Sequence, residues 1–463
     1  MAISIPSIDF ERHDISTRMP FKYGIATMTE APHLFVRVEA SFDGETQKGI
    51  SADHLPPKWF TKEPDKDPLE EIEDMERVIR RAADFAKSIT ADTVFDFWYA
   101  LYQKQTLWAD EENIPPLLAH FGTSLIERAL IDAFCRYRRG TFAELLRTND
   151  FGIDLGLLRP ELAGKQPNEF LHAPLQTVTV RHTVGMADAL SEQEIPEQER
   201  LQDGLPQSLE ACIEFYGIKH LKIKLNGVLD QDLSRLNAIE ALVSEIDIKD
   251  FGFTLDGNEQ FKDVHSFRNF WDALHGSERM CRFFDHLIFV EQPFHRDLAL
   301  NEEIGEALKA WSDAPPIIID ESDATLDSAP RALELGYNGT SHKNCKGVFK
   351  GILNRCMINF RNQKAGREQF LMSGEDLANI GPVANHLDLV VQSTLGIESV
   401  ERNGHHYFTG LSVFDDPIQS NALKSFPRLY TREEDYVRLN IQHGRLDLSD
   451  LLKMPFGTDE SHF

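Results

Sequence analysis

The sequence predicts an α/β protein whose larger part is a barrel of alternating strands and helices, with an α+β region before it. From about residue 210 onward, short apolar runs alternate with longer helical patterns, which is typical of a parallel sheet. Each of five runs ends at a charged residue: Lys224, Asp256, Glu291, Asp320 and Lys343. These residues are 32, 35, 29 and 23 positions apart, and a (β/α)₈ barrel uses roughly 30 residues for each strand and helix.

The composition of the 463 residues is that of a folded globular enzyme, with 41% hydrophobic and 27% charged residues, which argues against disorder. The formal net charge of −27 argues against nucleic acid or an anionic membrane as a partner, since both bind basic faces. The five cysteines are scattered without CxxC spacing, which is typical of a reducing compartment. No signal peptide and no apolar stretch of membrane-spanning length is visible, so we expect a cytoplasmic protein.

The first 150 residues predict an α+β arrangement. Residues 1 to about 60 are expected to form short strands, with a hairpin turn at Asp43-Gly44. From about 70 to 150 the apolar spacing is helical, and Gly140 is expected to end the last long helix. Residues 185 to 210 predict a long surface loop.

The charged residues at the run ends are expected to meet, because the carboxyl ends of barrel strands converge on one mouth. Asp256, Glu291 and Asp320 would repel one another there unless a cation lay between them. An all-oxygen ligand set favours Mg²⁺ over zinc. A single carboxylate of this kind is more often a helix cap or loop acid, whereas three at barrel spacing indicate a metal site.

The segment "HLKIKLNG", from His220 to Gly227, places Lys222 and Lys224 on one face of a strand. An edge strand with a solvated face is one explanation, but a closed barrel has no edge. Next to each other and to a divalent cation, both lysines are expected to have a lowered pKa, which would make a base. Lys343, four strands later, enters from the opposite side. Such a set is suited to removing a proton from the carbon beside a carboxylate.

These motifs resemble those of the enolase superfamily, and most of all its mandelate racemase and muconate lactonizing enzyme group. The K-x-K motif is Lys222-Ile223-Lys224, and the D-x-N motif is Asp256-Gly257-Asn258. The segments "VEQPF", "IIIDES" and "SHKNCKG" carry the other three charged residues.

The resemblance implies a modified TIM (β/α) barrel with an α+β N-terminal capping domain. We predict the capping domain over residues 1–150, the barrel over 151–415, and a C-terminal segment, 416–463, that returns to the capping domain. The loops expected to close over the substrate are Tyr23 to Thr29 and Asp53 to Trp59.

The resemblance also implies roles at the mouth. Lys224 would be the base on one face and Lys343 the acid or base on the other, while Lys222 would orient the substrate carboxylate and tune Lys224. The cofactor would be Mg²⁺, with Mn²⁺ as a substitute, and its ligands three carboxylates: Asp256, Glu291 and Asp320. Substrate contacts are expected from three residues: Asn258, Glu375 and Tyr23.

Other polar residues near the expected strand ends have open or structural interpretations. Glu321 is a less favoured ligand, because on a strand its side chain points away from that of Asp320. His342 is interpreted as a core histidine, and either Glu375 or Asp376 could reach the mouth. Residues 402–408 are expected to form the eighth strand and its loop. Four residues are attributed to packing or left unassigned: Arg181, His182, His405 and His406.

The leading hypothesis is a Mg²⁺-dependent lyase or isomerase that removes the α-proton of a small carboxylic acid through an enediolate. Expulsion of a β-hydroxyl would make it a dehydratase, most of all of a sugar acid, and the polar and aromatic loop "DHLPPKWF" slightly favours a hydroxylated substrate. Return of the proton would make it a racemase or epimerase, and cycloisomerisation is a third variant. A non-catalytic metal- or ligand-binding barrel would not need the lysines, and a metal hydrolase would need histidine ligands that the strand ends lack. We also expect a homo-oligomer.

Overall fold

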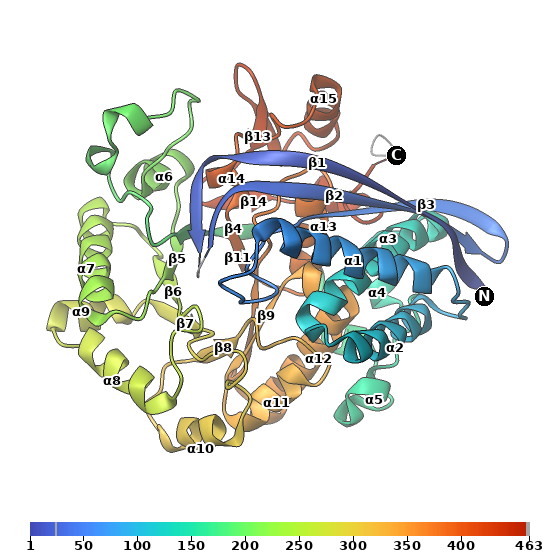
Figure 1. Ribbon diagram of the computed structural model, residues 1–463, viewed down its shortest axis with the longest axis horizontal. Helices are drawn as coiled ribbons and strands as arrows, with labels where there is room; N and C mark the ends of the chain where they lie inside the picture. The colour runs from blue at the N-terminus through green and yellow to red at the C-terminus, as the bar shows by residue number, and fades with distance from the viewer. Residues whose placement is uncertain (24–25, 460–463) are drawn as a thin grey trace.

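The computed structural model describes residues 1–23 and 26–459, and it consists of a barrel with an antiparallel sheet across one end (Figure 1). Within the described residues, eight parallel strands pair in sequence order, and the eighth pairs with the first, which closes the barrel. The predicted fold class is therefore confirmed. The barrel strands are β4 (Thr177–Val184), β5 (His220–Lys224), β6 (Gly252–Asp256), β7 (Leu287–Glu291), β8 (Ile317–Ile319), β9 (Gly339–His342), β10 (Leu371–Gly374) and β11 (Ser399–Arg402).

Helices follow the barrel strands and cover the outside of the barrel (Figure 1). A strand that is covered on both faces can have a continuous apolar sequence, and β8 is an example, with three buried isoleucines. The helices are α6 (Leu209–Tyr216), α7 (Leu229–Ile246), α8 (Val264–Leu274), α9 (Glu278–Phe284), α10 (Glu302–Ala310), α11 (Ser328–Leu335), α12 (Val348–Ala365) and α13 (Ala384–Thr394).

The N-terminal strands β1 (Ile3–Tyr23), β2 (Ala26–Phe42) and β3 (Glu45–His54) form an antiparallel sheet, which we call the capping sheet. The prediction of short strands is wrong, since β1 has 21 residues and β2 has 17. Register irregularities in the β1–β2 pair, after Ser4 and after Ser16, interrupt the regular pairing of the long ribbon. The hairpin at Asp43-Gly44 is confirmed, and both residues have positive φ.

The predicted loop from Tyr23 to Thr29 is mostly strand, because β1 extends to Tyr23 and β2 starts at Ala26. Gly24 and Ile25 lie outside the described residues. The second predicted loop is present after β3, although its first two residues still belong to that strand.

Four helices, α1 (Pro68–Ala86), α2 (Val94–Glu112), α3 (Pro116–Arg138) and α4 (Phe142–Arg147), follow the capping sheet. Helix α3 is buried from Leu117 to Cys135, and it packs between the sheet and helix α1. It ends two residues before the predicted Gly140, because Arg139 already adopts the left-handed conformation.

The C-terminal part of the chain contains α14 (Gly404–Tyr407), α15 (Asp416–Ser425), β12 (Tyr430–Arg432), β13 (Val437–Leu439) and β14 (Arg445–Asp447). Strand β14 pairs with β4 of the barrel. Beyond it, Thr458 donates a hydrogen bond from Oγ1 to Asp132 on α3 (2.8 Å), and Pro455 accepts one from the N–H of Phe142 on α4 (2.7 Å). The chain end thus contacts the N-terminal helices, while the predicted domain boundaries remain predictions.

The stretch from 185 to 210 has the predicted loop character, with two 3₁₀ turns, Glu192–Glu194 and Glu197–Glu199, before α6 begins. None of the described helices combines the length and the apolar character that crossing a membrane requires.

Candidate functional site

The barrel strands bring the five predicted charged residues to one rim. Strands β5, β6 and β7 end at Lys224, Asp256 and Glu291, while Asp320 and Lys343 come directly after β8 and β9. The parallel register pairs Lys224 with Asp256 and Asp256 with Glu291, so these three lie at one level. The spacing argument therefore located the rim correctly.

Three carboxylates at this rim lie close enough to share one metal ion. Oxygen atoms of Glu291, Asp320 and Glu375 lie within 4.8 Å of one another, and all three residues are buried. Glu375, which we predicted as a substrate contact, follows strand β10 and belongs to this group, whereas Asp256 does not. The predicted ligand set with Asp256 remains a prediction.

Glu291 is a buried carboxyl group whose negative charge is poorly compensated. Neither of its oxygens accepts a hydrogen bond from a described residue, although Oε2 lies 2.8 Å from Lys222 Nζ. Burial raises the pKa of Glu291 well above its ordinary value, and the neighbouring carboxylate of Glu375 raises it further. A divalent cation between Glu291, Asp320 and Glu375 would supply the missing partner, and three oxygen donors suit Mg²⁺. The residues present therefore fit this metal.

Lys222 lies inside the barrel among four carboxylates. Its Nζ is 2.8 to 3.1 Å from four carboxylate oxygens, which belong to Asp256, Glu291, Glu375 and Glu401. With so many ion pairs the side chain is held in one place, and its predicted contact with a substrate carboxylate remains a prediction.

Lys224 lies at the open side of this cluster and contacts both residues of the D-x-N motif. Its Nζ donates to Asp256 Oδ2 (2.5 Å) and, at 3.4 Å, to Asn258 Oδ1. The amide of Asn258 is oriented by the carbonyl oxygens of Leu225 and Asp256, to which its Nδ2 donates. Asn258 therefore serves as a neighbour of the predicted base, and its predicted contact with substrate remains a prediction.

Without a metal, the pKa values of both lysines are raised, while the predicted lowering next to a cation remains a prediction. Burial acts to lower the pKa of Lys222, but the four carboxylates, Asp256 first, raise it well above its ordinary value. Burial and the neighbouring Lys222 also act to lower the pKa of Lys224. The carboxylates outweigh them and raise its pKa above the ordinary value, with Asp256 contributing most and Glu401 and Glu291 less. The sequence pattern showed the two lysines but not how many carboxylates would surround them.

Lys343 reaches the same pocket from the other side of the barrel. Strand β9 lies four positions from β5 in the ring of eight strands, so Lys343 and Lys224 come from opposite sides. The Nζ of Lys343 donates to Asp320 Oδ1 and Glu375 Oε2, both at 2.7 Å, and lies 5.1 Å from the ring centre of Trp59. Burial acts against its positive charge, but Asp320 and Glu375 raise its pKa well above the ordinary value.

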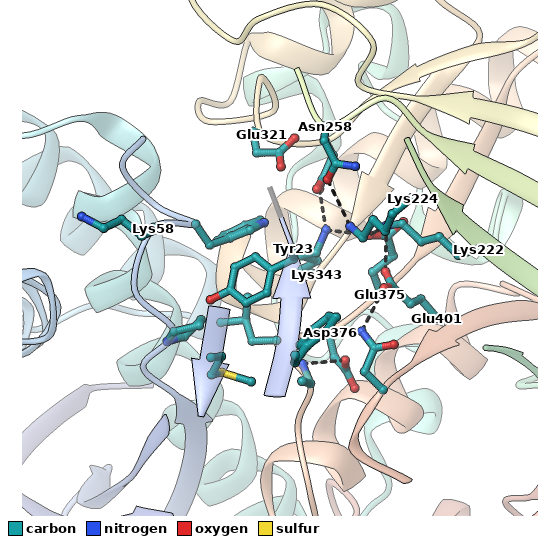
Figure 2. Close-up of a pocket in the computed structure, with 18 of the residues that line it drawn as sticks. Tyr23, Lys58, Lys222, Lys224, Asn258, Glu321, Lys343, Glu375, Asp376 and Glu401 are labelled. Carbon is teal, nitrogen blue, oxygen red and sulfur yellow. Dashed lines mark hydrogen bonds and ion pairs between the residues drawn. The ribbon is translucent and has the colours of Figure 1, made fainter. Parts of the chain in front are cut away.

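The capping sheet and the loop after it form the roof of this pocket. Figure 2 shows Lys222 and Lys224 on one side and Tyr23, from the end of β1, on the other. The hydroxyl of Tyr23 donates to the carbonyl oxygen of Pro57 (2.8 Å). The predicted contact of Tyr23 with the substrate would therefore be made by its ring, and it remains a prediction. Glu321 also lines the pocket, and the expectation that it points away is wrong, because β8 ends at Ile319 and strand alternation no longer applies.

Solved structures that resemble this chain cover almost all of it. It matches a mandelate racemase/muconate lactonizing protein from Herpetosiphon aurantiacus at 16% identity and a TM-score of 0.58, over 96% of both chains. It matches an enolase from Bradyrhizobium complexed with magnesium and mandelic acid at 14% identity and a TM-score of 0.57, over 96% of this chain and 93% of that one. It also matches a muconate lactonizing enzyme from Pseudomonas fluorescens complexed with muconolactone at 17% identity and a TM-score of 0.57, over 96% of this chain and 94% of that one.

The chain has the fold of the mandelate racemase and muconate lactonizing enzyme group. The predicted resemblance to the enolase superfamily is thus confirmed at the level of the fold. No protein-family model and no curated protein matches the sequence. At these identities the reaction has to follow from this chain's own residues.

Within this mandelate racemase fold, the sequence reasoning missed three side chains at or near the rim. Glu401 was missed because its strand, β11, has Val400 as its only apolar residue, so the eighth strand was expected three residues too late. Lys346 was missed because it follows Lys343 by one turn of a 3₁₀ helix, from which it donates to Asp320 Oδ1 at 2.7 Å. The third is Arg296, which donates to the carbonyl oxygen of Trp59. Trp59 itself ends a loop that was predicted to close over the substrate, but its contact with Lys343 was not predicted.

The histidines that had no clear role lie outside the pocket lining. His342 packs against Gly351 of α12 and bonds to Asn344 (3.0 Å), in agreement with its interpretation as a core residue. His182 and His405 bond to each other (3.0 Å), and His406 lies 3.4 Å from Cys212 Sγ.

Two further polar residues near the rim, Arg181 and Asp376, have partners in the protein. Arg181 is buried in the barrel and donates to Ser373 (2.7 Å), so the packing interpretation holds. Asp376 lines the pocket, and its carboxylate is paired with Arg402.

Proposed function

We propose that this protein is a metal-dependent racemase or epimerase that removes the proton α to the carboxylate of a small acid and returns it on the opposite face. The observation that carries the proposal is the placement of Lys224 and Lys343, which line one pocket and come from opposite strands of the barrel. An α-carbon between them would have an amine on each face, as proton removal and return require.

The remaining residues prepare the pocket for this chemistry. Glu291, Asp320 and Glu375 would hold Mg²⁺, which when bound stabilises the charge of the enediolate. Asp256 accepts a hydrogen bond from the predicted base Lys224 and so holds that amine beside the proposed metal ligands. Lys222 holds the surrounding carboxylates in place and presents a positive charge to the substrate carboxylate.

Dehydration of a hydroxy acid is the second candidate, because a further acid lines the pocket. Burial raises the pKa of Glu321 to about 8, which favours a protonated carboxyl group of the kind that could donate a proton to a departing hydroxyl. The first step, removal of the α-proton, is the same in both reactions.

The test is exchange of the α-proton in D₂O by the Mg²⁺-loaded protein, with both enantiomers of α-substituted carboxylic acids. Wild type is expected to incorporate deuterium from either enantiomer and to interconvert them. Lys224→Ala is expected to stop exchange from one enantiomer and Lys343→Ala from the other, whereas Lys249→Ala, an exposed lysine, changes neither. Loss of water would indicate dehydration, and undiminished exchange in both pocket variants would contradict the proposal.

A further inference from the structure

We propose that three buried side chains, those of His182, Cys212 and His406, form a second metal site, for a transition-metal ion such as Zn²⁺. A ring nitrogen of each histidine and the Sγ of Cys212 lie within 4.8 Å of one another. None of the three residues lines the pocket at the barrel mouth, so this inference goes beyond the proposed function and does not depend on it. The rim offers carboxylate oxygens, whereas this cluster offers nitrogen and sulfur, which are the donors that zinc prefers.

The three donors come from segments that are far apart in the sequence. His182 lies on the first barrel strand, β4, and Cys212 on helix α6, while His406 lies on α14, after the last barrel strand, β11. Strands β4 and β11 pair with each other, with His182 opposite Arg402. An ion bound to all three donors would therefore link the first strand, helix α6 and the segment after the last strand at the place where the barrel closes.

Cys212 and His406 already have the separation of two ligands of one ion. The Sγ of Cys212 lies 3.4 Å from Nδ1 of His406. Tetrahedral zinc binds sulfur at about 2.3 Å and nitrogen at about 2.0–2.1 Å, which places two such ligands about 3.6 Å apart. The rings of His182 and His406 have centres 4.8 Å apart and planes that meet at 72°, so they are not stacked. On binding, the metal replaces the thiol proton of Cys212, which is released to water as H⁺.

The surroundings of the cluster hold the ligands in place. His405 Nε2 bonds to Nδ1 of His182 (3.0 Å), and a metal-ligating histidine is commonly oriented by a hydrogen bond to its other ring nitrogen. The carbonyl oxygen of His406 accepts from Arg18 (3.0 Å), whose own charge is paired with Asp203. Among the described residues no carboxylate bonds to the three histidine rings, so nothing there requires them to be charged, and the neutral ring is the form that binds a metal.

A catalytic pair, in which the thiol attacks a substrate, is the alternative use of Cys212 and His406. Such a pair must be reached by its substrate, but Cys212 is 0% exposed and His406 is 2% exposed. A metal ion that is enclosed as the chain folds needs no such opening. The burial therefore favours a metal site over a nucleophile, and the three protein ligands leave one position of a tetrahedral ion for a further ligand.

The proposed site lies next to an aromatic contact that supports the roof of the pocket. Tyr407, the residue after His406, stacks on Phe21 of β1 with ring centres 4.1 Å apart. Phe21 in turn lines the pocket. An ion that fixes His406 would therefore hold α14 against the capping sheet, which gives it a structural role behind the pocket.

The experiment uses Co²⁺ as a probe of the full-length protein, in excess MgCl₂ so that oxygen sites stay occupied by Mg²⁺. Protein produced with added Co²⁺ is dialysed, and its cobalt content is measured together with the thiolate-to-cobalt charge-transfer absorption, which requires a bond between the ion and a cysteine sulfur. We expect wild type to hold about one Co²⁺ per chain with this absorption. Cys212→Ser is expected to lose the absorption, whereas Cys281→Ser, at an exposed cysteine, keeps it.

Two histidine variants keep the proposal testable if Cys212→Ser does not fold, which circular dichroism checks for each variant. His182→Gln and His406→Gln are expected to lower the Co²⁺ affinity at least about tenfold, since even a change outside the ligand shell costs that much. Wild type without thiolate-to-cobalt absorption, or a folded Cys212→Ser that retains it, would overturn the proposal. Unchanged Co²⁺ affinity in the folded histidine variants would overturn it as well.

Discussion

At the scale of single residues, Lys222 determines the charge balance of the rim. It is buried and pairs with four carboxylates, so its removal leaves several negative charges without compensation. Lys222→Met is therefore expected to lower the free energy of unfolding by about 3–5 kcal/mol in EDTA, which is the typical cost of breaking a buried ion pair. Urea unfolding of wild type and variant measures this difference in the free energy of unfolding.

The matched control is Lys249→Met, because Lys249 forms an exposed ion pair with Asp247 on the outside of the barrel. This pair is expected to contribute less than about 1 kcal/mol. Equal stability of the Lys222 and Lys249 variants would show that the rim carboxylates are compensated by other groups.

The rim also shows which residues could be predicted from sequence. Lys224, Asp256 and Glu291 each end an apolar run, so the period of the strands was sufficient to find them. Glu375 was considered, but its place beside Glu291 and Asp320 depends on the packing inside the barrel, which the period does not determine. The pKa values of the lysines depend on the same packing, which explains why they are raised in the chain without a metal.

At the scale of elements, Glu127 connects helix α3 with the start of barrel helix α12. Its carboxylate accepts the N–H groups of Val348 (3.1 Å) and Phe349 (2.7 Å), and burial raises its pKa to about 8. The folded protein thus holds this proton more tightly than the unfolded chain. Its stabilising contribution is complete below the ordinary pKa of 4.5 and is lost as the pH rises to about 8.

The glutamine in Glu127→Gln cannot ionise, so the stability of this variant is not expected to fall with pH for this reason. Between pH 5.5 and 8.5 the stability of wild type should fall relative to Glu127→Gln by about 1 kcal/mol per pH unit until pH 8. Urea unfolding at four pH values tests this.

The control has a pKa shift of the opposite sign. The backbone N–H of Thr141 holds the pKa of Glu144 below its ordinary value, so its contribution is lost only as the pH falls through the acidic range. Glu144→Gln should therefore differ from wild type by a constant amount between pH 5.5 and 8.5. A parallel course for wild type and Glu127→Gln would show that Glu127 stays ionised.

The strands also differ in how well they could be predicted. Strands β7 and β8 contain the continuous apolar runs Leu-Ile-Phe-Val and Ile-Ile-Ile, because helices cover them from outside, whereas β5 alternates Leu221 and Ile223 with lysines. Strand β11 has the sequence Ser-Val-Glu-Arg, in which three polar side chains bond to partners inside the protein, so no hydrophobic pattern marks it. The length of β1 was missed because a bent ribbon does not keep a single alternation along its course.

At the scale of the whole molecule, the floor of the pocket comes from the barrel and its roof from the capping sheet and the following loop (Figures 1 and 2). The floor was predictable, because a repeated strand–helix unit places its charged residues at regular intervals. The roof loop from Asp53 to Trp59 was predicted from the family resemblance, but its contacts were not, since Trp59 meets Lys343 across 284 positions of sequence and no local pattern encodes that contact.

The whole molecule carries a net charge of −27, so any added cation will stabilise it to some extent by screening. A specific metal site predicts a larger stabilisation by Mg²⁺ than screening alone would give. Binding of Mg²⁺ to the folded chain adds about 2.7 kcal/mol at a concentration of 100 times Kd. We expect MgCl₂ to raise the unfolding temperature further than NaCl of equal ionic strength, each measured after EDTA treatment and dialysis.

Glu291→Gln separates the specific effect of Mg²⁺ from the general one. Because burial and the neighbouring carboxylate of Glu375 raise the pKa of Glu291 and so disfavour its charge, the neutral glutamine is expected to be tolerated in EDTA. The variant should respond to NaCl as wild type does and lose the additional response to MgCl₂, since one of three clustered oxygen donors has lost its charge. Equal responses to the two salts in wild type, or a full Mg²⁺ response in the variant, would contradict a metal site at Glu291, Asp320 and Glu375.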